Sequence, residues 1–136
     1  MEVAEIGSFV RSNDQLARAR QAVKNAGHQQ LELSERFEEA KGRIAIGSMH
    51  LAKGLEFKAV AVMACDDDVL PLQSRIETIA DATELDDVYE TERHLFYVAC
   101  TRARDRLMVC GVEPASEFIA DLAERKAGQF AGNGVD

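Results

Sequence analysis

Two short apolar runs constrain the fold of this 136-residue chain most strongly. Arg43–Met49 (RIAIGSM) and Phe57–Ala64 (FKAVAVMA) contain β-branched residues and almost no charge, which predicts strands. Neither run alternates polar with apolar residues, and this is typical of strands buried on both faces in a parallel sheet. The pair therefore favours an α/β domain.

Further elements alternate along the chain. We expect a helix from Val88 to about Asp105, another over Ala115–Ala123, and additional strands at Ile6–Val10, Leu31–Leu33 and Leu107–Val112. Strands that alternate with helices predict an α/β fold with three layers and a mostly parallel central sheet. We expect one domain over residues 1–123 and a disordered polar tail over residues 124–136.

Local signals place one more helix and two irregular segments. Ser12 and Gln15 have the spacing of a capping box, and Gly27 suits the position just past a helix end. Ser34–Gly42 is charged and is expected to form a loop or a short helical turn. The polar stretch Asp66–Asp87 is expected to be a long excursion with at most a short helix.

Composition limits the classes of function. A net charge of −8 argues against a protein that coats nucleic acid unspecifically, so any such contact must be local. No apolar run approaches the roughly 20 residues of a membrane span, and the start of the chain lacks the basic region of a secretory signal. The cysteines form no CxxC pair, which favours reduced thiols in the cytoplasm; they are Cys65, Cys100 and Cys110.

Polar residues follow several predicted strands, where ligands of parallel α/β sheets bind. Arg11 follows the first strand, and Arg102 lies near the end of the helix predicted to reach Asp105. At about 100° per residue, Arg102 falls within the apolar arc of that helix, between Leu95 and Val98. A buried arginine is costly without an anion, so we expect either an ion pair with an acidic residue or a bound phosphate.

The segment SMHLAKGLE after the second large strand is the third polar site. Taken singly, His50 fits a core histidine, Lys53 and Gly54 fit a tight turn, and Glu56 fits a surface acid. Together they form a polar site whose ligand does not follow from spacing alone. Because no GxxxxGK[ST] phosphate loop occurs, the chain by itself cannot cradle a triphosphate in the usual way.

Three stretches resemble motifs of superfamily 1 DNA helicases of the UvrD/Rep/PcrA type. SMHLAKGLEFKAVAV resembles motif V (T-x-H-x-x-K-G-L-E-[FW]), and ETERHLFYVACTRARDRLMV resembles motif VI (E-E-R-R-L-x-Y-V-[AG]-x-T-R-A). FVRSNDQ resembles motif IV ([LF]-x-R-[ST]-N-x-Q). The motifs stand in the family's order over about residues 5–123, and two long motifs in order are highly specific.

The resemblance implies the second, C-terminal RecA-like motor domain of an ATP-dependent DNA helicase or translocase with 3′-to-5′ direction. In that family ATP and Mg²⁺ bind between two such domains, and the N-terminal RecA-like domain supplies the phosphate loop and metal ligands. The implied partners are single-stranded DNA and that first domain. The resemblance assigns no metal ligand to this chain, and it implies that the isolated chain has no ATPase activity.

The same resemblance implies roles for individual residues. Arg102 matches the motif VI arginine finger that contacts the γ-phosphate, and Arg11 matches its motif IV partner. Gly54 and Glu56 would approach the nucleotide, with Glu56 at the ribose hydroxyls. The positions implied to contact the DNA backbone are Ser48 and His50.

The chain departs from the family pattern at three points. Ser48 stands where threonine is usual, which keeps the hydroxyl group. Val10 stands where many members have an aromatic residue that stacks on adenine, and Phe9 is adjacent. Only about 36 residues separate Arg11 from Ser48, so the large accessory domain of UvrD and Rep is missing.

An alternative function is a stand-alone, non-catalytic module derived from a helicase that binds nucleic acid or a partner.

Overall fold

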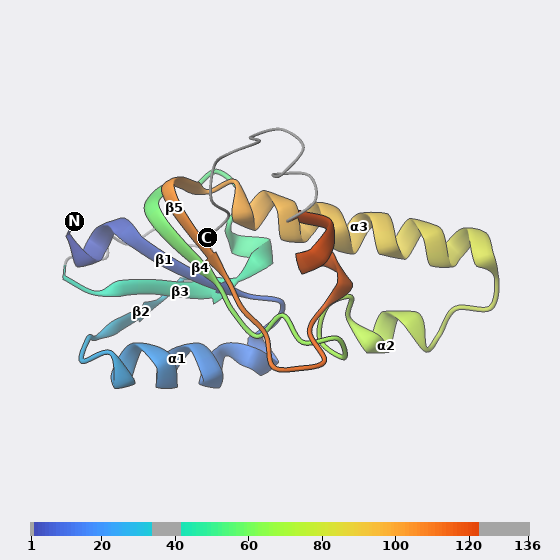
Figure 1. Cartoon of the computed structure of the whole chain (residues 1–136), viewed down its shortest axis with the longest axis horizontal. Helices are drawn as coiled ribbons and strands as arrows, with labels where there is room; N and C mark the ends of the chain where they lie inside the picture. Colours follow the sequence, from blue (N-terminus) through green and yellow to red (C-terminus); the bar gives the residue numbers. More distant parts are fainter. Residues whose placement is uncertain (1, 34–41, 123–136) are drawn as a thin grey trace.

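Five parallel strands form one sheet in the order β2-β3-β1-β4-β5. Figure 1 shows the computed structural model, which describes residues 2–33 and 42–122. The predicted tail over 124–136 and most of the predicted loop Ser34–Gly42 lie outside these residues. The strands are β1 Ile6–Val10, β2 Gln30–Glu32, β3 Ile44–Ser48, β4 Phe57–Val62 and β5 Ala103–Val109. The predicted α/β class with a parallel sheet is confirmed.

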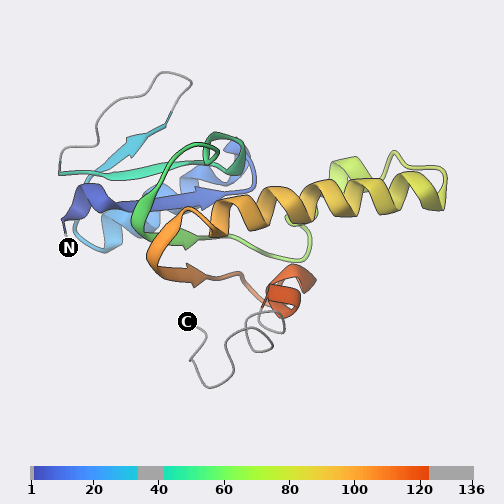
Figure 2. The same ribbon diagram turned by 90° about the horizontal axis from the view of Figure 1, so that it is seen from above.

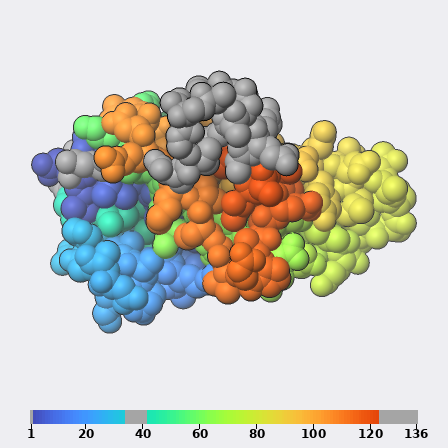
Figure 3. Space-filling view, in the orientation of Figure 1, coloured from blue at the N-terminus to red at the C-terminus, as the bar shows by residue number. Residues whose placement is uncertain are grey.

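Helices cover both faces of the sheet (Figure 1). The α-helices are α1 Leu16–Asn25, α2 Gln73–Ile76 and α3 Ala82–Cys100, and residues 117–122 are also helical. Single 3-10 turns are η1 Val3–Glu5, η2 Asn13–Gln15 and η3 Met49–Leu51. Seen from above, the first half of α3 extends beyond the sheet with α2 beside it (Figure 2), and Figure 3 shows this end protruding from the molecule.

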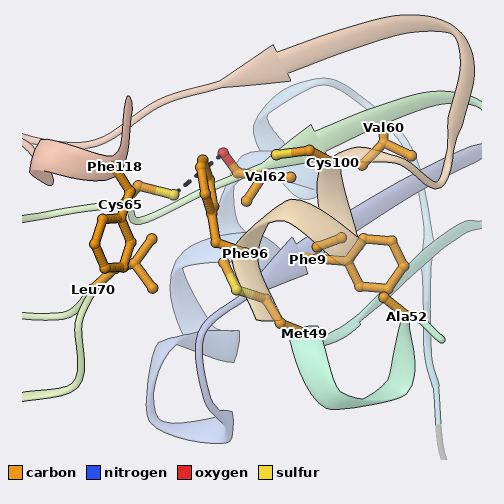
Figure 4. Close-up of a cluster of buried hydrophobic side chains, with 11 residues drawn as sticks. Phe9, Met49, Ala52, Val60, Val62, Cys65, Leu70, Phe96, Cys100 and Phe118 are labelled. Atoms are coloured by element: carbon orange, nitrogen blue, oxygen red, sulfur yellow. Dashed lines mark hydrogen bonds between the residues drawn. The ribbon is translucent and has the colours of Figure 1, made fainter. Parts of the chain in front are cut away.

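The two faces of the sheet carry separate cores, because successive strand residues point to opposite sides. Val10 packs with Val23 of α1 on one face. Phe9 packs with Phe96 of α3 on the other face, and Figure 4 shows this cluster with Met49 of η3 against the two rings. The strands are buried on both sides only because each helix layer supplies its own apolar stripe.

The first helix begins later than the capping-box signal predicts. An α-helical conformation begins at Leu16, after the 3-10 turn η2. The side chain of Ser12 makes no capping bond, and its hydroxyl has no hydrogen-bond partner among the described residues, so the predicted capping box is wrong. The Gln15 side chain instead accepts a hydrogen bond from Arg18 Nη1 at 3.1 Å. The predicted stop at Gly27 is confirmed by its φ of +80°.

The long helix α3 begins and ends earlier than predicted. Asp81 caps it, because its side chain accepts a hydrogen bond from the Glu84 amide at 2.9 Å. The helix ends at Cys100, since the carbonyl of Arg102 accepts a hydrogen bond from the Phe57 amide and pairing with β4 begins there. Arg102 therefore lies in a turn, and the helical angle that put it on a buried face is wrong.

Within residues 2–33 and 42–122, no helix is both long enough and apolar enough to span a membrane. The longest helix, α3, has 19 residues and carries several acidic side chains on its exposed surface.

Candidate functional site

A buried ion pair joins the end of β1 to α3. Arg11 directly follows β1 at the centre of the sheet, and its side chain is 4% exposed. Its Nε donates to Glu92 Oε1 at 2.8 Å and its Nη2 donates to Glu92 Oε2 at 2.7 Å. Glu92 is fully buried. This two-point geometry holds the guanidinium in one orientation.

Glu92 accepts two further hydrogen bonds. The Leu72 amide donates to Oε1 at 2.7 Å, and Arg75 Nη1 donates to Oε2 at 2.8 Å. Burial by itself would raise the pKa of the Glu92 carboxyl, but the hydrogen bonds from Arg11, the Leu72 amide and Arg75 outweigh it and lower that pKa. The carboxylate is therefore ionised, and each of its two oxygens accepts two hydrogen bonds.

Sequence reasoning missed Glu92, because it stands in a run of acids that fits an exposed helix face. The signal that could have found it is its spacing to Phe96 and Ala99, at positions i, i+4 and i+7 of α3. These three residues form one buried stripe. A carboxylate within an apolar stripe requires a cation, and Arg11 provides it.

His50 connects a third segment to this pair. It lies in η3, directly after β3, and its Nε2 is 3.2 Å from Arg11 Nη1. Arginine can only donate, so Nε2 is the acceptor wherever this contact is a hydrogen bond. Residues from the predicted motifs IV, V and VI thus meet at the carboxyl end of β1 and β3, as expected for the ligand-binding edge of a parallel sheet.

A cavity of about 660 Å³ opens next to these residues. Its volume lies within the range of small-molecule sites. The lining includes three cationic side chains, two histidines and, among the described residues, no acidic side chain, although the chain as a whole carries a net charge of −8. The cations are Lys53, Arg75 and Arg102, and the histidines are His50 and His94. The cavity therefore favours an anion.

Arg102 lines the cavity without a carboxylate partner in the described part of the chain. Its Nε donates to the Val98 carbonyl at 3.2 Å, its Nη1 to the Leu55 carbonyl at 3.4 Å, and its Nη2 to Thr101 Oγ1 at 3.1 Å. Neutral acceptors hold the guanidinium in place, and no carboxylate among residues 2–33 and 42–122 compensates its charge. Of the two alternatives drawn from the sequence, the ion pair with an acidic residue is therefore not formed within this part of the chain.

The motif V residues separate into two groups. Gly54 lines the cavity in a turn with φ of +82°, a conformation that favours glycine. Glu56 does not line it: its side chain is 64% exposed and pairs with Arg104 Nε at 3.3 Å. Ser48, the last residue of β3, is 8% exposed and also lies outside the lining.

Neither candidate for adenine stacking is accessible in this domain. Phe9 is fully buried, with its ring centroid 5.8 Å from that of Phe57, and Val10 is fully buried on the opposite face of the sheet. Arg11 also lies outside the cavity lining, and it contacts the cavity wall through His50 and through Glu92 to Arg75. The structure thus brings Gly54, His50 and Arg102 to one cavity and places Arg11 behind it.

The described residues do not fit a divalent metal site. Magnesium prefers carboxylate oxygens and water. Over residues 2–33 and 42–122, no group of three or more His, Cys, Asp or Glu side chains could hold a metal ion, and the cavity lining is basic. We therefore assign no metal-dependent step to these residues.

Comparison with known proteins gives a consistent result. The sequence profile of the UvrD-like helicase C-terminal domain family matches residues 6–113. ATP-dependent DNA helicase UvrD1 of Mycobacterium leprae is 43% identical over 70 residues, which is 52% of this chain and 8% of the relative. ATP-dependent DNA helicase PcrA of Bacillus subtilis is 34% identical over 106 residues, 68% of this chain and 13% of the relative. The chain thus spans about a tenth of these relatives.

One solved structure has a similar fold. It is the C-terminal domain of a possible DNA helicase from Lactobacillus plantarum, with a TM-score of 0.57 and 24% identity. The match covers 85% of this chain and 61% of the other. At this identity the likeness supports the fold alone.

Proposed function

Because the chain belongs to the UvrD-like helicase C-terminal domain family, we propose that it is the second RecA-like motor domain of an ATP-dependent 3′-to-5′ DNA helicase. It works opposite a first RecA-like domain, which supplies the phosphate loop that this sequence does not contain and the metal ligands that are not found among residues 2–33 and 42–122. The ligands of the complete site are ATP with Mg²⁺ on one side and single-stranded DNA on the other.

The observation that carries this proposal is the state of Arg102. Its guanidinium is positioned by neutral oxygens beside a cavity whose described lining has no acidic side chain, so no carboxylate of the described residues has to be displaced before it meets a phosphate. Negative charge develops on the phosphate oxygens during phosphoryl transfer, and a preorganised cation stabilises that charge. Arg102 is therefore assigned as the arginine finger.

Arg11 is proposed as the partner of Arg102. Its guanidinium is held by Glu92 and His50, so direct contact with a phosphate requires that at least one of these bonds is exchanged. Until then the pair with Glu92 fixes the wall of the cavity. This gives Arg11 a positioning role while it is bonded to Glu92 and a catalytic role after the exchange.

The motif V turn is proposed to face both ligands. Gly54 lies at the cavity, where the absence of a side chain lets a nucleotide approach the backbone. Glu56 is exposed and can accept hydrogen bonds from ribose hydroxyls. Ser48 and His50 are the proposed DNA contacts, and His50 couples the DNA to the nucleotide site because it is bonded to Arg11.

The test is Arg102→Ala in the protein that combines this chain with a first motor domain. We expect the DNA-stimulated ATPase rate to fall by about 10³-fold or more, while nucleotide and DNA affinities stay within a few-fold. Arg20→Ala serves as control, since Arg20 pairs with Glu32 on the surface, outside the cavity lining. Normal turnover of the Arg102 variant would remove the arginine-finger assignment.

The isolated 136-residue chain provides a second test. Without a phosphate loop it is expected to show no ATPase activity with or without single-stranded DNA. Robust turnover by the purified chain would contradict the proposal that ATP hydrolysis requires the phosphate loop of a first motor domain. A combined protein that binds DNA but never hydrolyses ATP would instead favour the non-catalytic module.

A further inference from the structure

Arg75 is a second arginine at the cavity, and none of the three helicase-like motifs contains it. It lies on the short helix α2, within the polar excursion between β4 and α3. Its side chain is 38% exposed and lines the same cavity as Arg102. The tertiary structure thus gives the excursion a position in the site that its sequence did not indicate.

The bonding of Arg75 differs from that of Arg11. Arg11 is buried and uses three nitrogens, two on Glu92 and one at His50. In the described part of the chain the Arg75 guanidinium makes one hydrogen bond, from Nη1 to Glu92 Oε2 at 2.8 Å. A guanidinium has five N–H donors, so most donors of Arg75 remain available.

The charge of Arg75 is also in excess at this point. The single carboxylate that it contacts is already balanced by the bidentate contact with Arg11. Two arginines therefore share one carboxylate, and the more exposed of them faces a cavity whose lining is basic. An anion in the cavity would meet the Arg75 guanidinium, which Glu92 holds through Nη1 and whose other N–H groups can donate to the anion.

Glu92 also holds the backbone of this excursion. The Leu72 amide, at the start of α2, donates to Oε1 of the same carboxylate at 2.7 Å. With the Arg75 contact, α2 is tied to α3 at two points, one backbone and one side chain. Anchored in this way, Arg75 is preorganised at the cavity before any ligand arrives.

We propose that Arg75 is a phosphate-contacting residue of the nucleotide site, and that the segment between β4 and α3 serves to place it there. The proposal rests on the proposed function of the cavity and extends it to a residue outside the motifs. Arg75 and Arg102 then both donate to the polyphosphate group, while Glu92 positions Arg75 without touching the ligand.

The test is a titration of the 136-residue chain with sodium tripolyphosphate at fixed ionic strength, followed by NMR of the arginine Nε–Hε signals. Constant ionic strength keeps general screening equal for all variants. We expect the Arg75 signal to shift on binding. Arg75→Gln should weaken the affinity for tripolyphosphate by about tenfold, because one charge-assisted hydrogen bond is lost. Arg75→Lys should restore part of that affinity.

Arg20→Gln is the matched control, because it removes one partly exposed, ion-paired arginine outside the cavity lining and should leave the affinity unchanged. Thermal melting reports whether each variant is folded. If Arg75→Gln does not fold, the shift of the Arg75 signal in the unmodified chain decides.

Three results would overturn the proposal: an Arg75 signal that does not move, an Arg75→Gln variant with unchanged affinity, or no binding to the unmodified chain. Each of them leaves the proposed function standing, because that function is tested by turnover and by Arg102. The reverse result is normal ATPase turnover of the Arg102→Ala protein together with tripolyphosphate binding at Arg75. It would contradict the arginine-finger assignment and leave the phosphate contact of Arg75 standing.

Discussion

Arg11 and Glu92 lie 81 positions apart in the sequence, and both side chains are buried in a two-point ion pair. The pair ties the central strand β1 to helix α3. Burying two charges is costly, and an intact pair gives little net stability over an apolar pair. Removing one partner is different, since it leaves an uncompensated charge in the interior.

The Glu92→Gln substitution is the first prediction. It leaves the Arg11 guanidinium buried without a counter-charge, so we expect the free energy of unfolding to fall by about 3–5 kcal/mol. Urea denaturation measures it. The control Glu32→Gln removes a carboxylate that is 42% exposed from its pair with Arg20 and should change stability by less than about 1 kcal/mol.

A double variant extends this first prediction. Arg11→Met combined with Glu92→Met removes both charges, so its loss of stability should be clearly smaller than the sum of the two single losses. Additive losses would mean that the two side chains contribute independently.

Acid sensitivity is the second prediction. The hydrogen bonds of Glu92 outweigh the effect of burial, so the pKa of its carboxyl in the folded protein lies below the ordinary value of 4.5. The stability it contributes is therefore complete above pH 4.5 and is lost as pH falls through the lower, folded-state pKa. Urea midpoints measured from neutral pH to about pH 3 should fall more steeply for the unmodified chain than for Glu92→Gln.

Part of the acid dependence should survive in that variant. The hydrogen bond from Arg18 lowers the pKa of Asp66, whose contribution is likewise lost on acidification. Identical slopes for the two proteins would show that Glu92 is not ionised by its contacts in the folded state.

The third prediction compares two glycines with left-handed backbone. Gly54 and Gly27 have φ of +82° and +80°, and a Cβ at either would meet no atom within 4 Å. Alanine should therefore cost about 1–2 kcal/mol at both positions through backbone strain. Gly54 alone of the two lines the cavity, so only Gly54→Ala should also weaken tripolyphosphate binding in the NMR titration. Equal affinity in the two variants would contradict a role for the turn.

The fourth prediction concerns His50→Ala in the protein with both motor domains. We expect DNA stimulation of the ATPase to fall more than the basal rate, because His50 is the proposed link between DNA and Arg11. The control is His28→Ala, at an exposed position after α1. Equal loss of stimulated and basal rates would argue against a DNA-facing role.

The positions of four strands could be predicted well, whereas the ends of helices could not, and the fifth strand, predicted at Leu107–Val112, spans Ala103–Val109. The β-branched runs gave β1, β3 and β4 close to their observed bounds, since burial on both faces leaves a local pattern in the sequence. The start of α3 was missed because its exposed first turns resemble a loop in composition. Its end was missed because pairing between Arg102 and Phe57 stops the helix, and that contact is long-range.

By itself, the sequence determined the α/β class, the parallel sheet and, through three motifs, the segments that approach one another. Only the tertiary structure decided which charges meet. Glu92, Arg75 and Arg11 come from three separate segments, and their meeting depends on the packing of α2 beside α3 and of α3 against β1. Local patterns record burial, because burial acts on each residue where it stands. Pairing of charges depends on distances that only the folded chain sets.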